Sequence, residues 1–490
     1  MKRNSLRRLL ALTGTTALAL AGTVALGTAA HAAVGPDQRD APTEGTLTIN
    51  KYSGSPVGAG ETPDPANLLD GVEFTVSQVG TKSGDTCSPL DLTDASQWKG
   101  LKALFDSAPV APKGDFCLVK PAAVQSTVDG TTTFDLAVGI YFVEETDPGS
   151  HNIVSPVPSF YVSIPTAETG DGNGWNYNVV ADPKNQIMDL PSKTIETDQK
   201  DLVVGDNVAW NITVPVPTLN NNETFTTASV RDVLDSRLGY ESSALSVNGT
   251  TLTEGTHYTV DTDGVTWNFT KDGLAELDKA MGENLSIRLV TSVNSVGDGS
   301  VPNDDYSSEF NGSTVPGEKV PYTYWGQLSI FKHDDSRSKL PLQGAEFKVF
   351  ETDAQGVCAA TAPADGALAT GVSDKDGAVQ WNNVSPASVL GLWVANSEDG
   401  PLSDPERVYC VYETKVPAGH TAVPFENKVT IKPGEAQVFD LDVENARNAG
   451  PNLPLTGAGG TLALTIGGLL IIAAGLATIT VAKRRKAAAL

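Results

Sequence analysis

Short runs in which hydrophobic and polar residues alternate make up most of the chain. Gly, Pro, Asn and Asp separate these runs, which is typical of β-sandwich domains. Only two stretches, 95–105 and 273–281, have the spacing of short helices. The pattern therefore predicts an all-β protein.

Length and composition predict how the chain is divided. A chain of 490 residues fits roughly three domains. Pro and polar residues collect near 185–190 and 314–322, where we place the boundaries. The expected segments, in chain order, are a signal peptide over 1–32, domains over 33–186, 187–325 and 326–449, and a C-terminal tail over 450–490.

The N-terminus is typical of a secretory signal peptide. Four Lys and Arg residues precede an apolar run, which ends in the small-residue motif Ala30-His31-Ala32. We expect cleavage after Ala32, which would place the mature protein outside the cell. An uncleaved N-terminal membrane anchor is the alternative interpretation.

Charge and composition exclude several classes of function. The formal charge of −25 becomes −33 once the eight basic residues of the signal peptide and the tail are removed, which argues against nucleic-acid binding. The few His residues are scattered and no phosphate-binding or dinucleotide motif occurs, so we expect no metal site and no cofactor. Asp-rich stretches at 171–174 and 303–305 fit turns better than calcium loops.

The chain contains four cysteines, two in its first third and two in its last third. In an exported protein an even number indicates disulfides. Pairing within each third predicts Cys87–Cys117 and Cys358–Cys410. Cross-pairing between the two thirds is the alternative.

The C-terminal tail combines three signals. Residues 461–482 are almost wholly apolar and long enough to span a bilayer, and the basic run Lys483–Lys486 follows directly. Just upstream lies Leu453-Pro454-Leu455-Thr456-Gly457. The hydrophobic span alone would fit an ordinary single-pass anchor. With the pentapeptide it resembles the LPxTG sorting signal of Gram-positive surface proteins, which implies that a sortase cleaves after Thr456 and transfers it to an amine.

Two parts of the chain share an internal pattern. Residues 47–51 and 71–76 resemble 328–332 and 344–349, and residues 141–149 resemble 409–419. A repeat at this spacing indicates that the first and third domains are duplicates.

Side-chain alternation points several polar groups into these two domains. Residues two apart share a face of a strand, so Lys51 follows Leu47 and Ile49 toward the core, and Lys332 follows Leu328 and Ile330. The same counting turns Glu145 inward beside Tyr141 and Val143, and Glu413 inward beside Tyr409 and Val411. It also places Asn445 on an inner face with Phe439, Leu441 and Val443.

Burying these groups is costly unless they are paired. A buried Lys and Asn in contact can condense to an isopeptide and release ammonia, because their effective concentration is high. A salt bridge between Lys and Glu, with Asn as a hydrogen-bond partner, explains the pattern equally well. The residues alone leave both interpretations open.

The repeated segment Tyr-x-Val-x-Glu-Thr-x-x-Pro-x-Gly resembles the E-box of Gram-positive shaft pilins, whose domains are of the Cna B-type immunoglobulin-like fold. This resemblance implies three tandem β-sandwiches in which intramolecular Lys–Asn isopeptides are promoted by a carboxyl group. The implied sets are Lys332–Asn445 with Glu413, Lys193–Asn311 with Asp232, and Lys51–Asn185 with Glu145.

The end of the first domain, residues 175–185, resembles the pilin motif WxxxVxVYPK. Trp175, Val179, Pro183 and Lys184 match it, whereas Ala181 and Asp182 depart from it. Alternation predicts that Lys184 points outward while its neighbour Asn185 points inward. Lys184 is thus the expected acceptor for another subunit.

Together these features are similar to the major shaft subunit of a sortase-assembled fimbria. The resemblance implies a cell wall-anchored homopolymer that supports adhesion, joined from Thr456 to Lys184 of the next copy, and not a turnover enzyme. The implied partners are pilin-specific and housekeeping sortases, minor tip and basal pilins, peptidoglycan, and host or bacterial surface ligands. A monomeric wall-anchored adhesin or a basal pilin that binds host matrix is the alternative.

Overall fold

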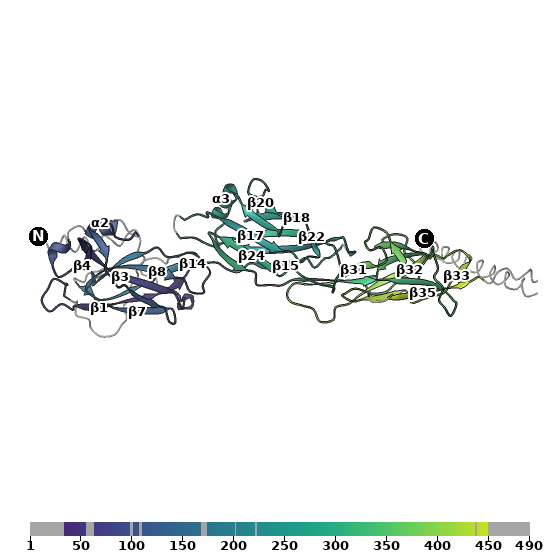
Figure 1. Ribbon diagram of the computed structural model, residues 1–490, viewed down its shortest axis with the longest axis horizontal. Helices are drawn as coiled ribbons and strands as arrows, with labels where there is room; N and C mark the ends of the chain where they lie inside the picture. Colours follow the sequence, from purple (N-terminus) through teal and green to yellow (C-terminus); the bar gives the residue numbers. More distant parts are fainter. Residues whose placement is uncertain are drawn as a thin grey trace, which may run out of the picture. The chain divides into compact units, whose positions relative to one another are not determined.

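The computed structural model describes residues 34–54, 63–98, 101–106, 110–167, 174–200, 202–220, 223–436 and 439–448. The predicted signal peptide, sorting pentapeptide and apolar span lie outside these residues. Within the described residues, almost all regular structure is β-strand, as the alternation predicted (Figure 1). None of the helices in this part of the chain is long and apolar enough to cross a membrane.

The first stretch of chain contains strands β1 to β14. The strands are β1 (Glu44–Asn50), β2 (Tyr52–Ser53), β3 (Glu73–Ser83), β4 (Thr86–Pro89), β5 (Phe116–Leu118), β6 (Ala123–Ser126), β7 (Thr131–Ala137), β8 (Gly139–Asp147), β9 (Ile153–Ser155), β10 (Phe160–Ile164), β11 (Thr166–Ala167), β12 (Trp175–Asn176), β13 (Asn178–Ala181) and β14 (Lys184–Ile187). The sheets run β13-β1-β7, β10-β8-β3-β4 and β2-β14-β9, while β5 and β6 also pair with β3.

The inner faces of these sheets form a continuous apolar core. Leu47 and Ile49 of β1 pack with Phe74 of β3 and Val143 of β8, and all four side chains are fully buried. A second cluster gathers around Trp98 and the short helices η3 (Ala95–Trp98) and α2 (Leu101–Asp106), close to the predicted helix at 95–105. A further short helix, η2, spans Pro65–Asn67.

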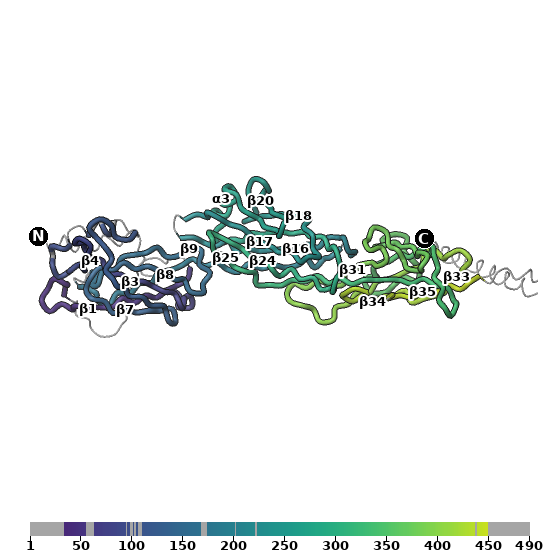
Figure 2. The backbone as a smooth tube through the Cα atoms, in the orientation of Figure 1, coloured from purple at the N-terminus to yellow at the C-terminus, as the bar shows by residue number. Residues whose placement is uncertain are grey.

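The second stretch of chain contains two five-stranded sheets. Its strands are β15 (Ser192–Ile195), β16 (Asn207–Pro215), β17 (Ala228–Val233), β18 (Leu238–Val247), β19 (Thr250–Leu252), β20 (Tyr258–Asp261), β21 (Thr266–Phe269), β22 (Asn284–Val293), β23 (Ser300–Pro302), β24 (Asp305–Phe310) and β25 (Ser313–Pro316). The sheets run β15-β16-β22-β18-β19 and β20-β21-β17-β24-β25, and Figure 2 traces the backbone through them. Helix α3 (Lys271–Lys279) lies at the predicted helix over 273–281, and the Thr270 hydroxyl accepts a hydrogen bond from the Gly273 amide at its start.

The third stretch contains the last strands. They are β26 (Tyr322–Leu328), β27 (Ile330–Asp334), β28 (Glu346–Glu351), β29 (Ala369–Ser373), β30 (Val379–Trp381), β31 (Leu390–Ser397), β32 (Arg407–Lys415), β33 (His420–Ala422), β34 (Lys428–Ile431) and β35 (Leu441–Arg447). Two of its sheets run β27-β35-β33 and β30-β29-β28-β32-β34. The chain as a whole divides into two compact units, and most of the second unit is 325–394 with the residues after 405. The finer division into three domains stays a prediction.

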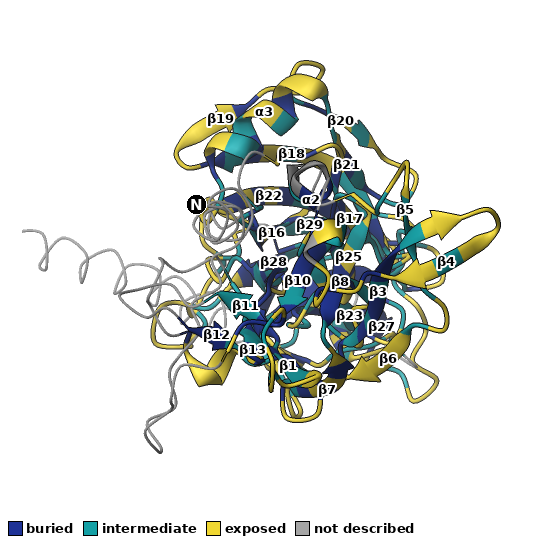
Figure 3. Ribbon diagram, turned by 90° about the vertical axis from the view of Figure 1, so that its left-hand side faces the viewer, coloured by how far each residue is buried: buried dark blue, intermediate teal, exposed yellow. Residues whose placement is uncertain are grey.

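Burial along several strands follows the predicted alternation, but Phe439 and Lys184 depart from it. Figure 3 shows buried positions along strands such as β3 and β22, and exposed ones at the β3–β4 hairpin. Lys51 and Lys332 are both fully buried, as predicted. Phe439 was expected on the inner face with Val443, but its side chain is 46% exposed. The reason is that β35 begins only at Leu441, so alternation cannot be extended back to Phe439.

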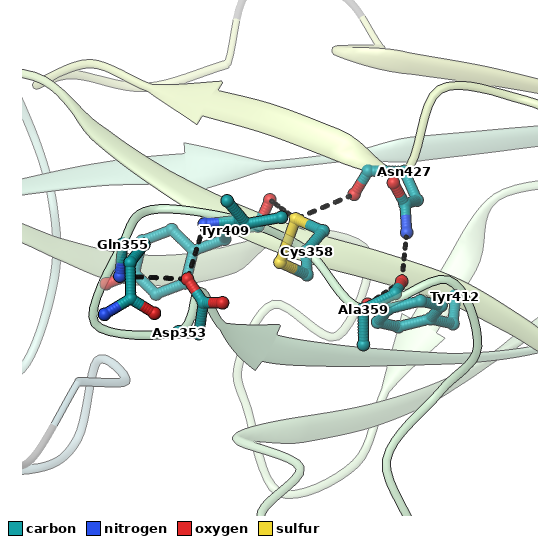
Figure 4. Close-up of a disulfide and its surroundings, with 9 residues drawn as sticks. Asp353, Gln355, Cys358, Ala359, Tyr409, Tyr412 and Asn427 are labelled. Atoms are coloured by element: carbon teal, nitrogen blue, oxygen red, sulfur yellow. Dashed lines mark hydrogen bonds between the residues drawn. A yellow bond between two sulfur atoms is a disulfide. The ribbon is translucent and has the colours of Figure 1, made fainter.

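Both predicted disulfides are present. Cys87 of β4 is bonded to Cys117 of β5, and the two strands flank β3. Cys358 is bonded to Cys410 of β32, as Figure 4 shows. Cys410 is buried and packs with Phe350 and Tyr412, so this disulfide ties the loop at Cys358 to a core strand.

Candidate functional site

Three clusters of buried Lys, carboxylate and Asn side chains are the candidate sites. In the third stretch, Glu413 Oε1 lies 3.5 Å from Lys332 Nζ, and Asn445 Nδ2 donates to Glu413 Oε2 at 2.9 Å. Lys332 Nζ also donates to the Val443 carbonyl at 3.2 Å. Lys332 and Asn445 are fully buried, and the Glu413 side chain is 3% exposed. The predicted trio is therefore brought together in a dry environment.

The first stretch assembles its predicted trio more tightly. Lys51 Nζ donates to Asn185 Oδ1 at 2.5 Å, and Asn185 Nδ2 donates to Glu145 Oε1 at 2.6 Å. Glu145 Oε2 lies 2.8 Å from Lys51 Nζ, so the carboxylate contacts both partners. The Val157 amide donates to Asn185 Oδ1 at 2.7 Å.

The two clusters are built from the same strand pairings. Each Asn lies on a strand that pairs in parallel with the chain just after the Lys: Asn185 is opposite Ser53, and Asn445 is opposite Asp334, in each case two residues beyond the Lys. Each Glu is opposite a buried Phe next to a register shift, with Phe74 facing Glu145 and Phe347 facing Glu413. The sequence repeat thus corresponds to a repeated site geometry.

Burial changes the ionisation of the lysines. Desolvation lowers the pKa of Lys51 to about 8, although the Glu145 carboxylate opposes this change. Desolvation likewise lowers the pKa of Lys332, with Glu413 opposing it. A lower pKa increases the fraction of neutral amine, and only the neutral amine is a nucleophile.

The geometry of the first and last clusters suits amide exchange. If the lysine nitrogen attacks Asn Cγ, an N–Cγ bond forms, the Cγ–Nδ2 bond breaks, and ammonia leaves with the proton that the lysine nitrogen loses. The Glu carboxyl contacts both nitrogens and is therefore placed to carry that proton. In the first cluster, the Val157 amide is aimed at the oxygen on which negative charge would develop.

The middle cluster forms around a different Asn from the one predicted. Lys193 Nζ lies 2.8 Å from both carboxylate oxygens of Asp232, and 4.3 Å from the centre of the Tyr306 ring. It also donates to the backbone carbonyl of Asn303 at 3.2 Å. Burial lowers the pKa of Lys193 and raises that of Asp232, while their mutual attraction opposes both changes.

Asn303 supplies the side-chain amide of this middle cluster. Asn303 is 1% exposed, and burial raises the pKa of the neighbouring Asp232 carboxyl although Lys193 and the Asn303 amide oppose this rise. Among the described residues, neither Asn303 Nδ2 nor Oδ1 makes a hydrogen bond of good geometry. A buried amide in this state is unusual, because such groups are normally paired.

Asn311, the residue predicted for this role, lies elsewhere. It occupies a turn after β24 with a φ of 51°, and its Oδ1 accepts hydrogen bonds from the amide and hydroxyl of Thr226. Its side chain is thus engaged in shaping the turn. The structure does not bring Asn311 to Lys193.

Lys184 is separated from the first cluster, although it is the neighbour of Asn185. Its side chain was expected to point outward, yet the residue is only 9% exposed, and Asn185 and Gln186 beside it are also buried. Lys184 Nζ lies 4.9 Å from the centre of the Tyr52 ring. Desolvation lowers the pKa of Lys184, while Asp182 acts in the opposite direction.

One predicted element of chemistry cannot be placed. The sorting pentapeptide with Thr456 lies outside the described residues. Within the described ranges, no group of three His, Cys, Asp or Glu side chains is arranged to hold a metal ion.

Comparison with known proteins places the chain in a family. It is 30% identical to the fimbrial subunit type 2 of Actinomyces naeslundii, over 90% of this chain and 90% of that protein. The chain belongs to the Actinomyces fimbrial subunit family. The fimbrial subunit type 1 of Actinomyces viscosus is 28% identical, over 90% of this chain and 91% of the relative.

Further similarities of this fimbrial subunit agree with that assignment. The structure of the full-length major pilin SpaD from Corynebacterium diphtheriae is similar, with a TM-score of 0.60 and 25% identity over 83% of this chain and 98% of that one. Residues 188–320 match the Sgo0707 N2 domain, and residues 446–488 match the LPXTG cell wall anchor motif. The fimbrial subunit is therefore a structural protein of a cell wall-anchored surface fimbria, as the sequence predicted.

Three residues of the candidate sites in this fimbrial subunit were not predicted from its sequence. Asn303 shares the parity of the buried Val301, so counting along that strand would have turned it inward. Tyr52 follows Lys51 directly, but nothing local to it indicates that it covers Lys184. Val157 contributes a backbone amide, for which the sequence carries no signal.

Proposed function

We propose that this chain is the major shaft subunit of its fimbria, polymerised by a sortase that joins Thr456 of one copy to Lys184 of the next. The observation that carries the proposal is the separation of two neighbouring residues. Asn185 belongs to the buried trio of its own chain, whereas the amine of Lys184 faces Tyr52 outside that trio. Lys184 thus stays available for a second reaction.

Internal cross-links are the second part of the proposal. We infer isopeptide bonds Lys51–Asn185 with Glu145, Lys332–Asn445 with Glu413, and Lys193–Asn303 with Asp232. Each bond removes a buried positive charge from its lysine and releases one ammonia. The short contacts in the first trio and the buried Asn303 amide beside Asp232 support them. Together with the two disulfides, such bonds would resist pulling and proteolysis.

The wider assembly follows from the same chemistry. A pilin-specific sortase would catalyse the Thr456–Lys184 linkage, and a housekeeping sortase would transfer the last subunit to peptidoglycan. Minor tip or basal pilins and surface ligands complete the proposed partners, and adhesion is the proposed role of the fibre.

Substitution of the acceptor tests the main proposal. Lys184→Arg keeps a positive charge but removes the primary amine, so the high-mass ladder of wall extracts on a denaturing gel should collapse to monomer. Lys200→Ala, at a side chain that is 79% exposed, is the matched control and should leave the ladder intact. An unchanged ladder in Lys184→Arg would show that the linkage uses another amine.

A further inference from the structure

The environment of Lys184 includes an aromatic residue that no motif assigns to it. Tyr52 is 7% exposed, and its ring centre lies 4.9 Å from Lys184 Nζ. A lysine ammonium within about 6 Å of a ring centroid is attracted to the ring face. The contact therefore gives the Lys184 side chain a preferred direction.

The strand pairing explains why this contact forms. Strands β2 and β14 are parallel, with Tyr52 opposite Lys184 and Ser53 opposite Asn185. The Tyr52 amide also donates to the Pro183 carbonyl at 3.0 Å. On the other side of the same pairing, Lys51 contacts Asn185. The pairing of β2 with β14 thus brings together Lys51 and Lys184, which we propose react with different partners.

The charged groups around Lys184 are few. Asp182 precedes it in the chain, and Asn50 Nδ2 donates to Asp182 Oδ1 at 3.0 Å. Lys51 is close enough for its positive charge and that of Lys184 to repel each other. Tyr52 is the titratable group of β2, and burial raises the pKa of its hydroxyl. Strand β9, which pairs with β14 beyond Lys184, carries no titratable side chain.

We propose that Tyr52 is a positioning residue for the intersubunit linkage, whose ring covers the Lys184 side chain and holds its amine in a fixed, poorly hydrated position. This inference rests on the proposed role of Lys184 as the acceptor. The linkage step forms a bond between Lys184 Nζ and the Thr456 carbonyl carbon and breaks the thioester to the sortase. The amine gives up one proton, and the sortase thiolate leaves and can accept it.

The ring contributes to this step in two ways. It restricts the rotamers of a long side chain, so less entropy is lost when the amine meets the thioester. It also excludes water from the amine, and this desolvation favours the neutral form that attacks, against the attraction of the ring for the ammonium. Removing the ring should therefore slow the linkage at neutral pH, and alkaline pH should restore part of the rate.

Two variants of the full chain separate these effects. Tyr52→Ala removes the ring, and Tyr52→Phe keeps it. In cells that express each variant as their only copy, Tyr52→Ala should reduce the high-mass ladder by about threefold or more, the size expected when a long side chain regains its rotamer freedom. Tyr52→Phe should restore it. The pH dependence of Lys184 acetylation by an N-hydroxysuccinimide ester, mapped by mass spectrometry, should shift to higher pH in Tyr52→Ala only.

The outcomes distinguish this inference from the proposed function. If Lys184→Arg abolishes the ladder while Tyr52→Ala leaves both the ladder and the acetylation profile unchanged, Tyr52 has no positioning role although Lys184 is the acceptor. If Tyr52→Phe loses the ladder as completely as Tyr52→Ala, the ring is not what matters, and the inference also fails. If Lys184→Arg keeps the ladder, the proposed function itself is wrong. Unchanged disulfides and ammonia loss in the purified variants control for misfolding.

Discussion

Lys184 and Asn185 are consecutive residues of β14, yet their side chains take part in different contacts. The Asn185 side chain forms hydrogen bonds with Lys51 and Glu145 in the buried trio, and Lys184 faces the Tyr52 ring. Alternation along a strand sends neighbours to opposite sides. Here it places the group of the proposed internal cross-link next to the group of the proposed external one.

The carboxyl group of the last cluster should be essential for its cross-link. Glu413→Ala should leave Lys332 and Asn445 unlinked, so the protein retains one ammonia that the wild type loses. The variant should also be destabilised by about 3–5 kcal/mol, the cost of leaving a buried charge without its partner. Intact mass and thermal melting measure the two effects. Glu444→Ala, at an exposed position next to Asn445 on β35, is the control and should lose ammonia normally.

The middle cluster offers a sharp choice between two asparagines. Asn303→Ala should abolish the cross-link of Lys193, whereas Asn311→Ala should leave it intact and perturb only the turn at Thr226. Peptide mapping after proteolysis measures which lysine peptide stays joined to which Asn peptide. Finding Lys193 joined to the peptide that contains Asn311 would contradict the assignment.

If the first cluster is left unlinked, the pH dependence of stability should reveal its buried amine. In Asn185→Ala, Lys51 stays a free amine, and its pKa of about 8 in the folded chain lies below its ordinary value of 10.5. Between these two values the unfolded chain binds more protons, so stability should rise as pH increases through this window. Hydrogen exchange of the β14 amides at pH 7.5 and above pH 10, corrected for intrinsic exchange rates, measures this rise in the free energy of unfolding. Lys51→Met combined with Asn185→Ala lacks the titrating group and should lack this rise.

The Cys358–Cys410 disulfide should stabilise the fold without affecting the isopeptide. It closes a loop with a sequence separation of 52, which restricts the unfolded chain. Loop entropy predicts that the disulfide adds about 4 kcal/mol to the free energy of unfolding. The contribution is smaller if an isopeptide between Lys332 and Asn445 already closes a longer loop around it. Cys358→Ala combined with Cys410→Ala should lower the melting temperature, while intact mass still shows the loss of ammonia. Retention of that ammonia would mean that the disulfide is needed to align β32.

The sequence by itself determined which side chains enter the two repeated cores. Lys51, Glu145, Lys332 and Glu413 are all buried where alternation placed them, because period-two counting is local and needs only a strand flanked by apolar residues. Pairing the four cysteines within each third of the chain predicted both disulfides, and the structure excludes the alternative of cross-pairing.

Only the tertiary structure decided which distant partners meet. Asn303, not Asn311, lies at Lys193, and Tyr52 covers Lys184, because these contacts depend on which strands pair and in which register. Alternation assigns a residue to a face, but it says nothing of the strand that lies opposite. For the same reason it could not show that Lys184, on the expected outer face, is covered by a neighbouring strand.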